Sequence, residues 1–386
     1  MPDRGDVTWR DGAALRRAAW WSETTPLPTR VGAADDRTTA DAAFRRARSG
    51  EALVYGGDWH NARQLLAAMG RRLVPPRPRE PGLAGLFRAE RALRRAEHEV
   101  LSRLAVPLDP GWRSPLRRAP PLDAALAEAF GPAPERAALL PLREVLGAVG
   151  AHEWQRKGVP VPALGASVHP FYGVFAPVRG EYVDLAARAL AERPPPGGAL
   201  AFDVGTGTGV LAALLARAGC RVVASDIDGR AAACARENLA RLGVGAAVEV
   251  QERDLFPDGE ARLVVANPPW VPAEPHGALD RAVYDPGGTV LARLVEGLPA
   301  HLAPDGEAWL ILSDLAELLG LRAAGELAAR FAAAGLVVRA TLSARPAHPR
   351  ARDASDPLAA ARARERTTLY VLGVLGSPAR RGPTIA

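Results

Sequence analysis

The pattern of apolar and polar positions divides the chain into two parts near residue 165. Before that point, apolar residues recur at helical spacing in segments that prolines interrupt, and Leu86, Leu93 and Val100 share one face of the clearest segment. The pattern predicts a mainly helical amino-terminal domain over residues 1–165. Arginines occupy other faces of the same helix, which fits either a solvated surface or one that follows the phosphates of a nucleic acid.

From about residue 166 onward, short apolar runs alternate with amphipathic helical segments. Such alternation is typical of an α/β fold with a mostly parallel sheet, which is expected here over residues 166–386. The seven expected strands are residues 199–204, 221–225, 247–251, 263–266, 308–313, 337–342 and 368–373. No ordinary crossover fits between the last two strands, so they are expected to pair like a hairpin across the arginine-rich loop 344–366.

Composition narrows the class of protein. A chain of 386 residues, 48% of them hydrophobic, can bury cores in two domains. The first dozen residues are charged and no run of about 18 apolar residues occurs, so secretion and a membrane span are not expected. Cys220 and Cys234 are too few for a disulfide framework and are expected to be small core residues in a reducing cytoplasm. The net charge of +6 permits an anionic partner such as RNA, but the preference for arginine also fits a GC-rich genome.

A glycine-rich turn follows the first expected strand of the second part and leads into a helix. A nicotinamide fingerprint would place its third glycine at position 210, where this chain has Val210. A phosphate loop would require a lysine after the turn, and none is near. The glycines Gly205, Gly207 and Gly209 therefore predict a turn whose backbone amides approach a compact cofactor.

Acidic residues end the next two expected strands. Asp226 lies 21 residues after Gly205, where an acid in this topology accepts hydrogen bonds from ribose hydroxyls. Asp226 or Asp228 could instead cap the helix expected from residue 229. Asp254 follows the third strand and is a candidate for the exocyclic amine of adenine, with the Leu255 backbone beside it; the alternative is a simple turn residue.

The tetrapeptide Asn267-Pro268-Pro269-Trp270 follows the fourth expected strand, at the sheet edge where ligands bind in such folds. A planar amide or exocyclic amine is a poor nucleophile until its N–H groups are held. The Asn267 side-chain oxygen and the Pro268 carbonyl could accept both hydrogens, while the prolines fix where these oxygens point. The Trp270 ring could stack on the flat group. The alternative is a Pro-Pro turn that only closes the strand.

Together these motifs resemble the class I S-adenosylmethionine-dependent N-methyltransferases of the Asn-Pro-Pro-Tyr/Trp type, the methyltransferase small domain. That family includes release-factor glutamine methyltransferases and ribosomal RNA guanine-N2 and adenine-N6 enzymes. The resemblance implies a Rossmann-like seven-stranded sheet and methyl transfer to a planar nitrogen held by Asn267, Pro268, Pro269 and Trp270. The cofactor contacts that it implies are Asp203, Gly205, Thr206, Gly207, Gly209, Asp226, Ile227, Asp254, Leu255 and Asn267.

A segment upstream of the glycine turn, residues 175–181, is similar to the Pro-Arg…Thr-Glu segment that covers the cofactor in the glutamine enzymes. The match is partial because Val178 separates the proline from Arg179 and Gly180 stands in place of the threonine. Arg179 and Glu181 are therefore expected either to cover the cofactor or to form a local ion pair. Trp270 departs from the family's usual tyrosine by keeping the stacking face and losing the hydroxyl.

A wider resemblance covers nearly the whole chain, through residues 38–43, 57–66, 152–159 and 169–175, which look like a bacterial group of two-part class I methyltransferases. By analogy the amino-terminal part presents the substrate. An RNA base and a glutamine of a ribosome-associated protein compete as acceptors, and a biosynthetic small molecule or a non-catalytic cofactor-binding module are the alternatives. No metal is expected, because Arg156 stands where a metalloprotease helix would place its second histidine.

Overall fold

The computed structural model describes residues 5–178, 180–277, 279–345 and 356–377. The chain forms two compact units. Unit 1 comprises Met1–Arg79 and Arg88–Arg156, and unit 2 comprises Glu80–Phe87 and Lys157–Ala386. The sequence placed the boundary at 165/166, close to this division, but did not predict that residues 80–87 belong with the second unit.

Unit 1 is built on a six-stranded mixed sheet in the order β1-β2-β6-β5-β4-β3. Its strands are β1 (Asp6–Asp11), β2 (Ala14–Trp20), β3 (Arg30–Ala34), β4 (Glu51–Tyr55), β5 (Leu104–Leu108) and β6 (Ala138–Pro141). Its helices are α1 (Ala40–Arg48), α2 (Trp59–Gly70), α3 (Gly82–Leu101), α4 (Asp123–Phe130) and α5 (Leu142–Lys157), of which α3 begins and α5 ends with residues of unit 2. β3, β4 and β5 are parallel neighbours.

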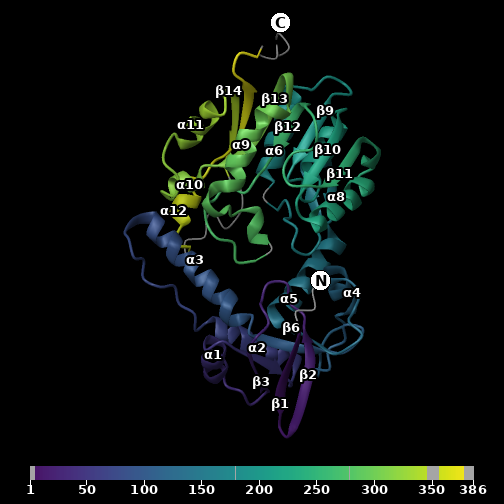
Figure 1. The fold of residues 1–386 in the computed structure, drawn as a ribbon, viewed down its shortest axis with the longest axis vertical. Helices are drawn as coiled ribbons and strands as arrows, with labels where there is room; N and C mark the ends of the chain where they lie inside the picture. The colour runs from purple at the N-terminus through teal and green to yellow at the C-terminus, as the bar shows by residue number, and fades with distance from the viewer. Residues whose placement is uncertain (1–4, 179, 278, 346–355, 378–386) are drawn as a thin grey trace. The chain divides into compact units, whose positions relative to one another are not determined.

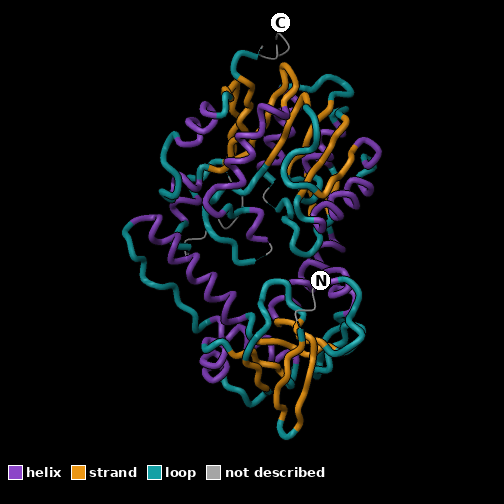
Figure 2. Tube along the Cα trace, viewed as in Figure 1, coloured by secondary structure: helices purple, strands orange, loops and turns teal. Residues whose placement is uncertain are grey.

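This sheet corrects the prediction of a mainly helical amino-terminal domain. The missed strands β4, β5 and β6 are short runs that are buried along most or all of their length. A strand buried on both faces shows no alternation of apolar and polar residues, so its period does not distinguish it from a buried helix. Unit 1 is therefore an α/β unit, as the orange strands and purple helices in Figure 2 show.

Unit 2 contains the predicted seven-stranded sheet, in the order β11-β10-β9-β12-β13-β15-β14. The strands are β9 (Leu200–Val204), β10 (Arg221–Asp226), β11 (Val248–Glu252), β12 (Ala261–Ala266), β13 (Leu302–Ser313), β14 (Leu336–Ala344) and β15 (Thr367–Val374). All seven expected strands are confirmed, and β14 and β15 pair antiparallel as expected. A separate two-stranded sheet, β7 (Val159–Val161) with β8 (Ala166–Val168), precedes them.

Helices cover both faces of the larger sheet (Figure 1). They are α6 (Glu181–Glu192), α7 (Val210–Arg217), α8 (Gly229–Arg241), α9 (Thr289–His301) and α11 (Glu326–Ala333). The short helices α10 (Leu315–Leu318) and α12 (Ala359–Arg362) pack instead in a separate apolar cluster. Leu263 and Val265 of β12 pack in the cluster with α6, α7 and α8, whereas Val264 and Ala266 pack in the cluster with α9 and α11. Consecutive residues thus serve opposite cores, which explains the continuous apolar runs of these strands.

Both cysteines are buried and free, which confirms them as small core residues. Burial raises the pKa of the Cys234 thiol to about 12, so this thiol stays protonated at neutral pH. No helix in the described part of the chain combines the length and apolar character needed to cross a membrane.

Candidate active site

The paired ends of parallel strands bring the predicted site residues to one edge of the sheet. Val204, the last residue of β9, is paired with Ser225 of β10 and with Ala266 at the end of β12. Gly205 and Asn267 directly follow Val204 and Ala266, so the glycine turn and the Asn-Pro-Pro-Trp motif leave adjacent strands. Adjacent strands are separated by about 4.8 Å.

The glycine turn has a backbone that requires glycine. Gly205, Gly207 and Gly209 have φ values of +75°, +56° and +81°. The Gly205 and Thr206 amides both donate to the Ser225 carbonyl, each at 2.9 Å, which fixes the turn to β10. No heavy atom lies within 4 Å of the place where a Cβ of residue 205 or 207 would stand, whereas at 209 it would meet Ala235 at 3.3 Å. The first two glycines therefore leave open space, and the third permits close packing on α8.

Asp203 is fully buried beneath the turn. Its Oδ2 accepts hydrogen bonds from the Thr206 hydroxyl at 2.6 Å and from the Ala212 amide at 2.9 Å. Its Oδ1 is buried and has no hydrogen-bond partner within the described residues. Burial raises the pKa of this carboxyl to about 6, against the lowering effect of the two hydrogen bonds. An unpartnered buried acceptor of this kind is suited to a cationic ligand group.

Asp226 holds the turn rather than capping the helix. Its Oδ2 accepts from the Gly207 amide at 2.9 Å and its Oδ1 accepts from the Asp228 amide at 3.0 Å. Asp228 is the N-cap of α8, with its side chain accepting from the Arg230 amide, so the capping alternative applies to Asp228 alone. Burial raises the pKa of Asp226, against the effect of the amide hydrogen bonds. The neighbouring Ile227 is 70% exposed, which makes its side chain accessible to a ligand.

Asp254 already has a protein partner. Its Oδ2 accepts from Arg293 of α9 at 2.6 Å, and both side chains are about half exposed. Leu255 adopts a φ of +58°, and its carbonyl accepts a hydrogen bond from the Ser225 hydroxyl. These contacts fix the loop after β11 against the end of β10. The contact of Asp254 with an adenine amine stays a prediction, and it requires the carboxylate to share its oxygens with Arg293.

The Asn-Pro-Pro-Trp motif leaves polar atoms available. Asn267 is partly exposed, and within the described residues neither its side-chain amide nor the Pro268 carbonyl takes part in a hydrogen bond. Trp270 is partly buried and packs against two apolar clusters, and its indole N–H is buried without a partner in the described part of the chain. The Trp270 carbonyl accepts from Arg322 at 2.9 Å, which anchors the loop.

Two buried polar residues that the sequence did not predict hold this edge together. Asp285 is 1% exposed and accepts from the Val290 and Leu291 amides, each at 3.0 Å, at the start of α9. Its own amide donates to the Val271 carbonyl at 2.8 Å, so it ties the acceptor loop to α9. The signal in the sequence was an aspartate shortly before a helix, which is typical of a cap.

Asn238 of α8 is the second unpredicted residue. Its Nδ2 donates to the Thr208 carbonyl at 3.1 Å, and its Oδ1 accepts from the His169 amide at 2.7 Å. It therefore fastens the glycine turn to the segment 169–175, whose Phe171 and Val174 pack against α8. A buried amide on the apolar face of a helix was the available signal.

The predicted lid residues are only partly described. Glu181 is the first residue of α6 and is partly buried. Arg179 lies outside the described residues, so its pairing with Glu181 stays a prediction.

Comparisons with known proteins agree with this arrangement. Residues 166–332 match the family described as Methyltransferase small domain. The release factor glutamine methyltransferase of Cereibacter sphaeroides is 34% identical over 162 residues, which cover 38% of this chain and 56% of the relative. The ribosomal RNA small subunit methyltransferase C of Chromohalobacter salexigens is 34% identical over 156 residues, 39% of this chain and 42% of the relative.

The solved structures include a methyltransferase of Geobacter sulfurreducens in complex with S-adenosyl-L-homocysteine, with 17% identity and a TM-score of 0.35 over 50% of this chain and 90% of that one. The chain spans about half the length of the curated relatives named above. Residues 166–332, all of them in unit 2, are thus similar to the methyltransferase small domain.

Proposed function

We propose that the protein is a cytoplasmic N-methyltransferase that uses S-adenosylmethionine to methylate a planar nitrogen, either an exocyclic amine of an RNA base or the amide of a protein glutamine. One observation carries the proposal. Asn267, whose side-chain amide has no hydrogen-bond partner within the described residues, directly follows Ala266, and Ala266 pairs with Val204, the residue before Gly205. The relatives named for release-factor glutamine and ribosomal RNA methylation support this acceptor class.

The residues of the edge fit the cofactor. The buried Asp203 Oδ1 without a partner suits a cationic group, the space above Gly205 and Gly207 admits a ligand close to the backbone, and the accessible Ile227 offers an apolar surface. When bound, S-adenosylmethionine supplies a methyl group that its sulfonium already activates. Asp203, Asp226 and the glycine turn would hold it.

The acceptor side of the mechanism depends on Asn267 and Pro268. The Asn267 side-chain oxygen and the Pro268 carbonyl accept the two N–H groups of the planar nitrogen, which concentrates its lone pair and fixes its direction. The Trp270 ring covers the flat group. Holding the nitrogen near attack distance lowers the barrier by removing the entropy cost of the encounter. A strong general base is unnecessary, because the proton leaves after the methyl group has arrived.

The test is methyl transfer from labelled S-adenosylmethionine into total RNA and total protein of a strain that lacks the gene. The wild-type chain should label one of the two fractions. Asn267→Ala should lower the rate about 100-fold or more, since a preorganised polar contact to the reacting group is lost. Asn267→Asp keeps an acceptor oxygen and should retain more activity than the alanine variant.

The midpoint of thermal unfolding of Asn267→Ala controls for folding and should change little, because the side-chain amide has no hydrogen-bond partner within the described residues. Incorporation that the alanine substitution leaves unchanged would rule out this mechanism. Cofactor binding without incorporation into RNA or protein would favour the non-catalytic module or a small-molecule acceptor.

A further inference from the structure

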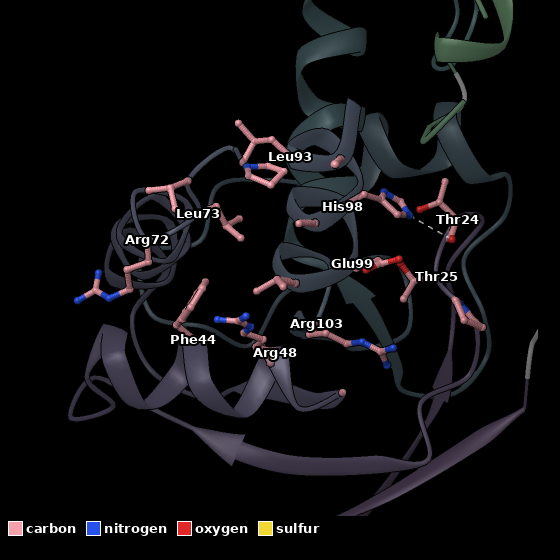
Figure 3. A pocket seen from close by; sticks show the side chains of 18 residues that line it. Thr24, Thr25, Phe44, Arg48, Arg72, Leu73, Leu93, His98, Glu99 and Arg103 are labelled. Atoms are coloured by element: carbon pink, nitrogen blue, oxygen red, sulfur yellow. Dashed lines mark hydrogen bonds between the residues drawn. The ribbon is translucent and has the colours of Figure 1, made fainter. Parts of the chain in front are cut away.

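A pocket of about 790 Å³ lies within unit 1, separate from every residue of the proposed methyl-transfer site. It is lined by α1, by the segment after α2, by α3 and by residues 24–26 after β2 (Figure 3). Ligand pockets of small molecules commonly have volumes of about 300–1,000 Å³. Much of the lining is apolar and includes Phe44, Leu73, Leu93 and Val100.

Two of the lining arginines have no partner in the described part of the chain. Arg48 in the last turn of α1 and Arg103 after α3 form neither an ion pair nor a side-chain hydrogen bond there. Arg103 is also partly buried. A partly buried cation without a counter-charge is unfavourable, and an anion in the pocket would relieve that cost.

The other charged side chains of the lining are already engaged. Arg72 pairs with Asp41 at 2.7 Å, and Figure 3 shows its side chain extending away from the other labelled residues. Glu99 accepts from the Arg95 Nε at 2.8 Å. Neither of these two ion pairs involves Arg48 or Arg103. The side chains of Arg48 and Arg103 extend in different directions in Figure 3, and Arg48 is exposed, so Arg103 is the arginine whose missing counter-charge points to a ligand.

A third unsatisfied group lines the same pocket. The Thr25 side chain is 4% exposed, and its hydroxyl is buried without a hydrogen-bond partner among the described residues. Two hydrogen bonds fix the Thr25 backbone. Its amide donates to the Ser22 hydroxyl at 2.9 Å, and its carbonyl accepts from the Trp20 indole N–H at 3.0 Å. Buried hydroxyls are normally paired, so this one points to a ligand.

From these groups we infer that the pocket binds a small amphipathic anion, in which one phosphate or carboxylate group is attached to an apolar or aromatic body. The anionic group is held by Arg103, the partly buried one of the two arginines. Thr25 adds a hydrogen bond, and the body packs on Phe44 and the leucines. A mononucleotide and a medium-chain fatty acid both have this chemistry.

Calorimetry on the full chain at low salt tests the inference with three probes: inorganic phosphate, adenosine monophosphate and decanoate. At least one amphipathic probe should bind one to one, more tightly than phosphate, with a dissociation constant below about 1 mM. Tighter binding of the nucleotide or of the fatty acid identifies the source of the ligand. Absence of binding by both amphipathic probes at millimolar concentration, or binding no tighter than that of phosphate, overturns the inference.

Arginine variants distinguish binding in the pocket from nonspecific attraction of an anion to the positive charge of the surface. Arg103→Gln should weaken binding about tenfold, because a charge-assisted contact is lost, and Arg48→Gln should weaken it less. Arg45→Gln is the matched control, since Arg45 is in the same last turn of α1 but does not line the pocket. Equal loss in all three variants would contradict a specific site.

Thr25→Val distinguishes a ligand contact from a structural hydroxyl. The substitution should weaken binding without lowering the midpoint of thermal unfolding, because the hydroxyl that it removes has no partner among the described residues. S-adenosylmethionine affinity should stay unchanged in every variant and so reports that the chain is folded. A fall in the unfolding midpoint with unchanged probe affinity would show that the hydroxyl does not contact the ligand and would count against the pocket.

Discussion

The carboxyl ends of the parallel strands in the two units have similar acids but different hydrogen bonding. In unit 1, the Asp36 Oδ1 accepts from the Tyr55 hydroxyl at 2.7 Å, from the Asp58 backbone amide at 3.0 Å and from the Asn61 side-chain Nδ2 at 3.1 Å. In unit 2, the Asp203 Oδ1, the Asn267 amide and the Trp270 indole have no partner within the described residues. Asp36 in unit 1 is satisfied by the protein itself, whereas the edge in unit 2 keeps polar atoms without a partner within the described residues.

This comparison teaches that an acid at a strand end does not by itself identify a site. Asp58 shows the same closure, since its Oδ1 caps α2 and its Oδ2 accepts from Arg118 at 2.6 Å. What distinguishes the edge in unit 2 is the set of polar atoms that remains after all internal hydrogen bonds are formed. Four predictions test this difference, in order of decreasing effect.

Asp226→Ala should lower the affinity for S-adenosylmethionine about 100-fold, because it removes the predicted ribose contact and also the acceptor for the Gly207 amide. Calorimetric titration of the cofactor measures the change. Asp228→Ala removes only the helix cap two residues away and is the control. Equal losses in the two variants would mean that Asp226 acts only through the local fold.

The raised pKa of Asp203 predicts a pH dependence of stability. The folded carboxyl titrates at about 6 and its ordinary pKa is 3.8, so the folded state binds the extra proton between these values. The free energy of unfolding should therefore fall as the pH rises through this window, by at most about 1.4 kcal/mol per pH unit. Asp203→Asn has no carboxyl to titrate at this position. Denaturant unfolding should therefore show that the free energy of unfolding of the variant rises relative to that of the wild type between pH 5 and pH 7.5.

Titration of Asp203 should change the cofactor affinity in the opposite direction to the free energy of unfolding. A cationic ligand prefers the ionised Asp203, so the affinity for S-adenosylmethionine should increase as the pH rises through about 6. Cofactor affinity of Asp203→Asn should be lower and nearly independent of pH in this range. An equal pH dependence in the variant would assign the effect to another group.

Asp36→Ala gives the smallest effect on the cofactor. It removes the shared acceptor of Tyr55, Asp58 and Asn61 in unit 1, so the midpoint of thermal unfolding should fall. Cofactor affinity should stay within about twofold of the wild type, as for independent sites. Thermal unfolding and calorimetry together measure both effects, and a large loss of cofactor affinity would contradict the independence of the two edges.

The sequence predicted unit 2 well, because its information is local. A strand, a glycine turn and a helix stand next to each other in the chain, and Asp226, Asp254 and Asn267 each follow their own strand. Gly205 and Asn267 lie close together because β9 and β12 are parallel neighbours, and each residue directly follows its strand. The prediction that Asp254 is free for adenine did not include Arg293, which lies 39 residues further along the chain.

The residues that sequence reasoning missed act over long separations. Asn238 bonds to the backbone of Thr208 and His169, and a side chain that binds distant main chain leaves no spacing pattern. The sheet of unit 1 was missed for a different reason, since strands such as β5 and β6 are buried runs without alternation. Their pairing depends on contacts between segments about 30 residues apart.

The assignment of residues 80–87 to unit 2 limits the modularity of the chain. Phe87 is 4% exposed and packs in a cluster with Val271 and Leu319, of which Val271 directly follows the Asn-Pro-Pro-Trp motif. The Phe87 ring centroid lies 6.5 Å from that of Tyr284. A fragment that begins at Lys157 would leave this apolar surface uncovered. Exchange of the amino-terminal half between homologues would therefore replace part of the packing beside the Asn-Pro-Pro-Trp loop.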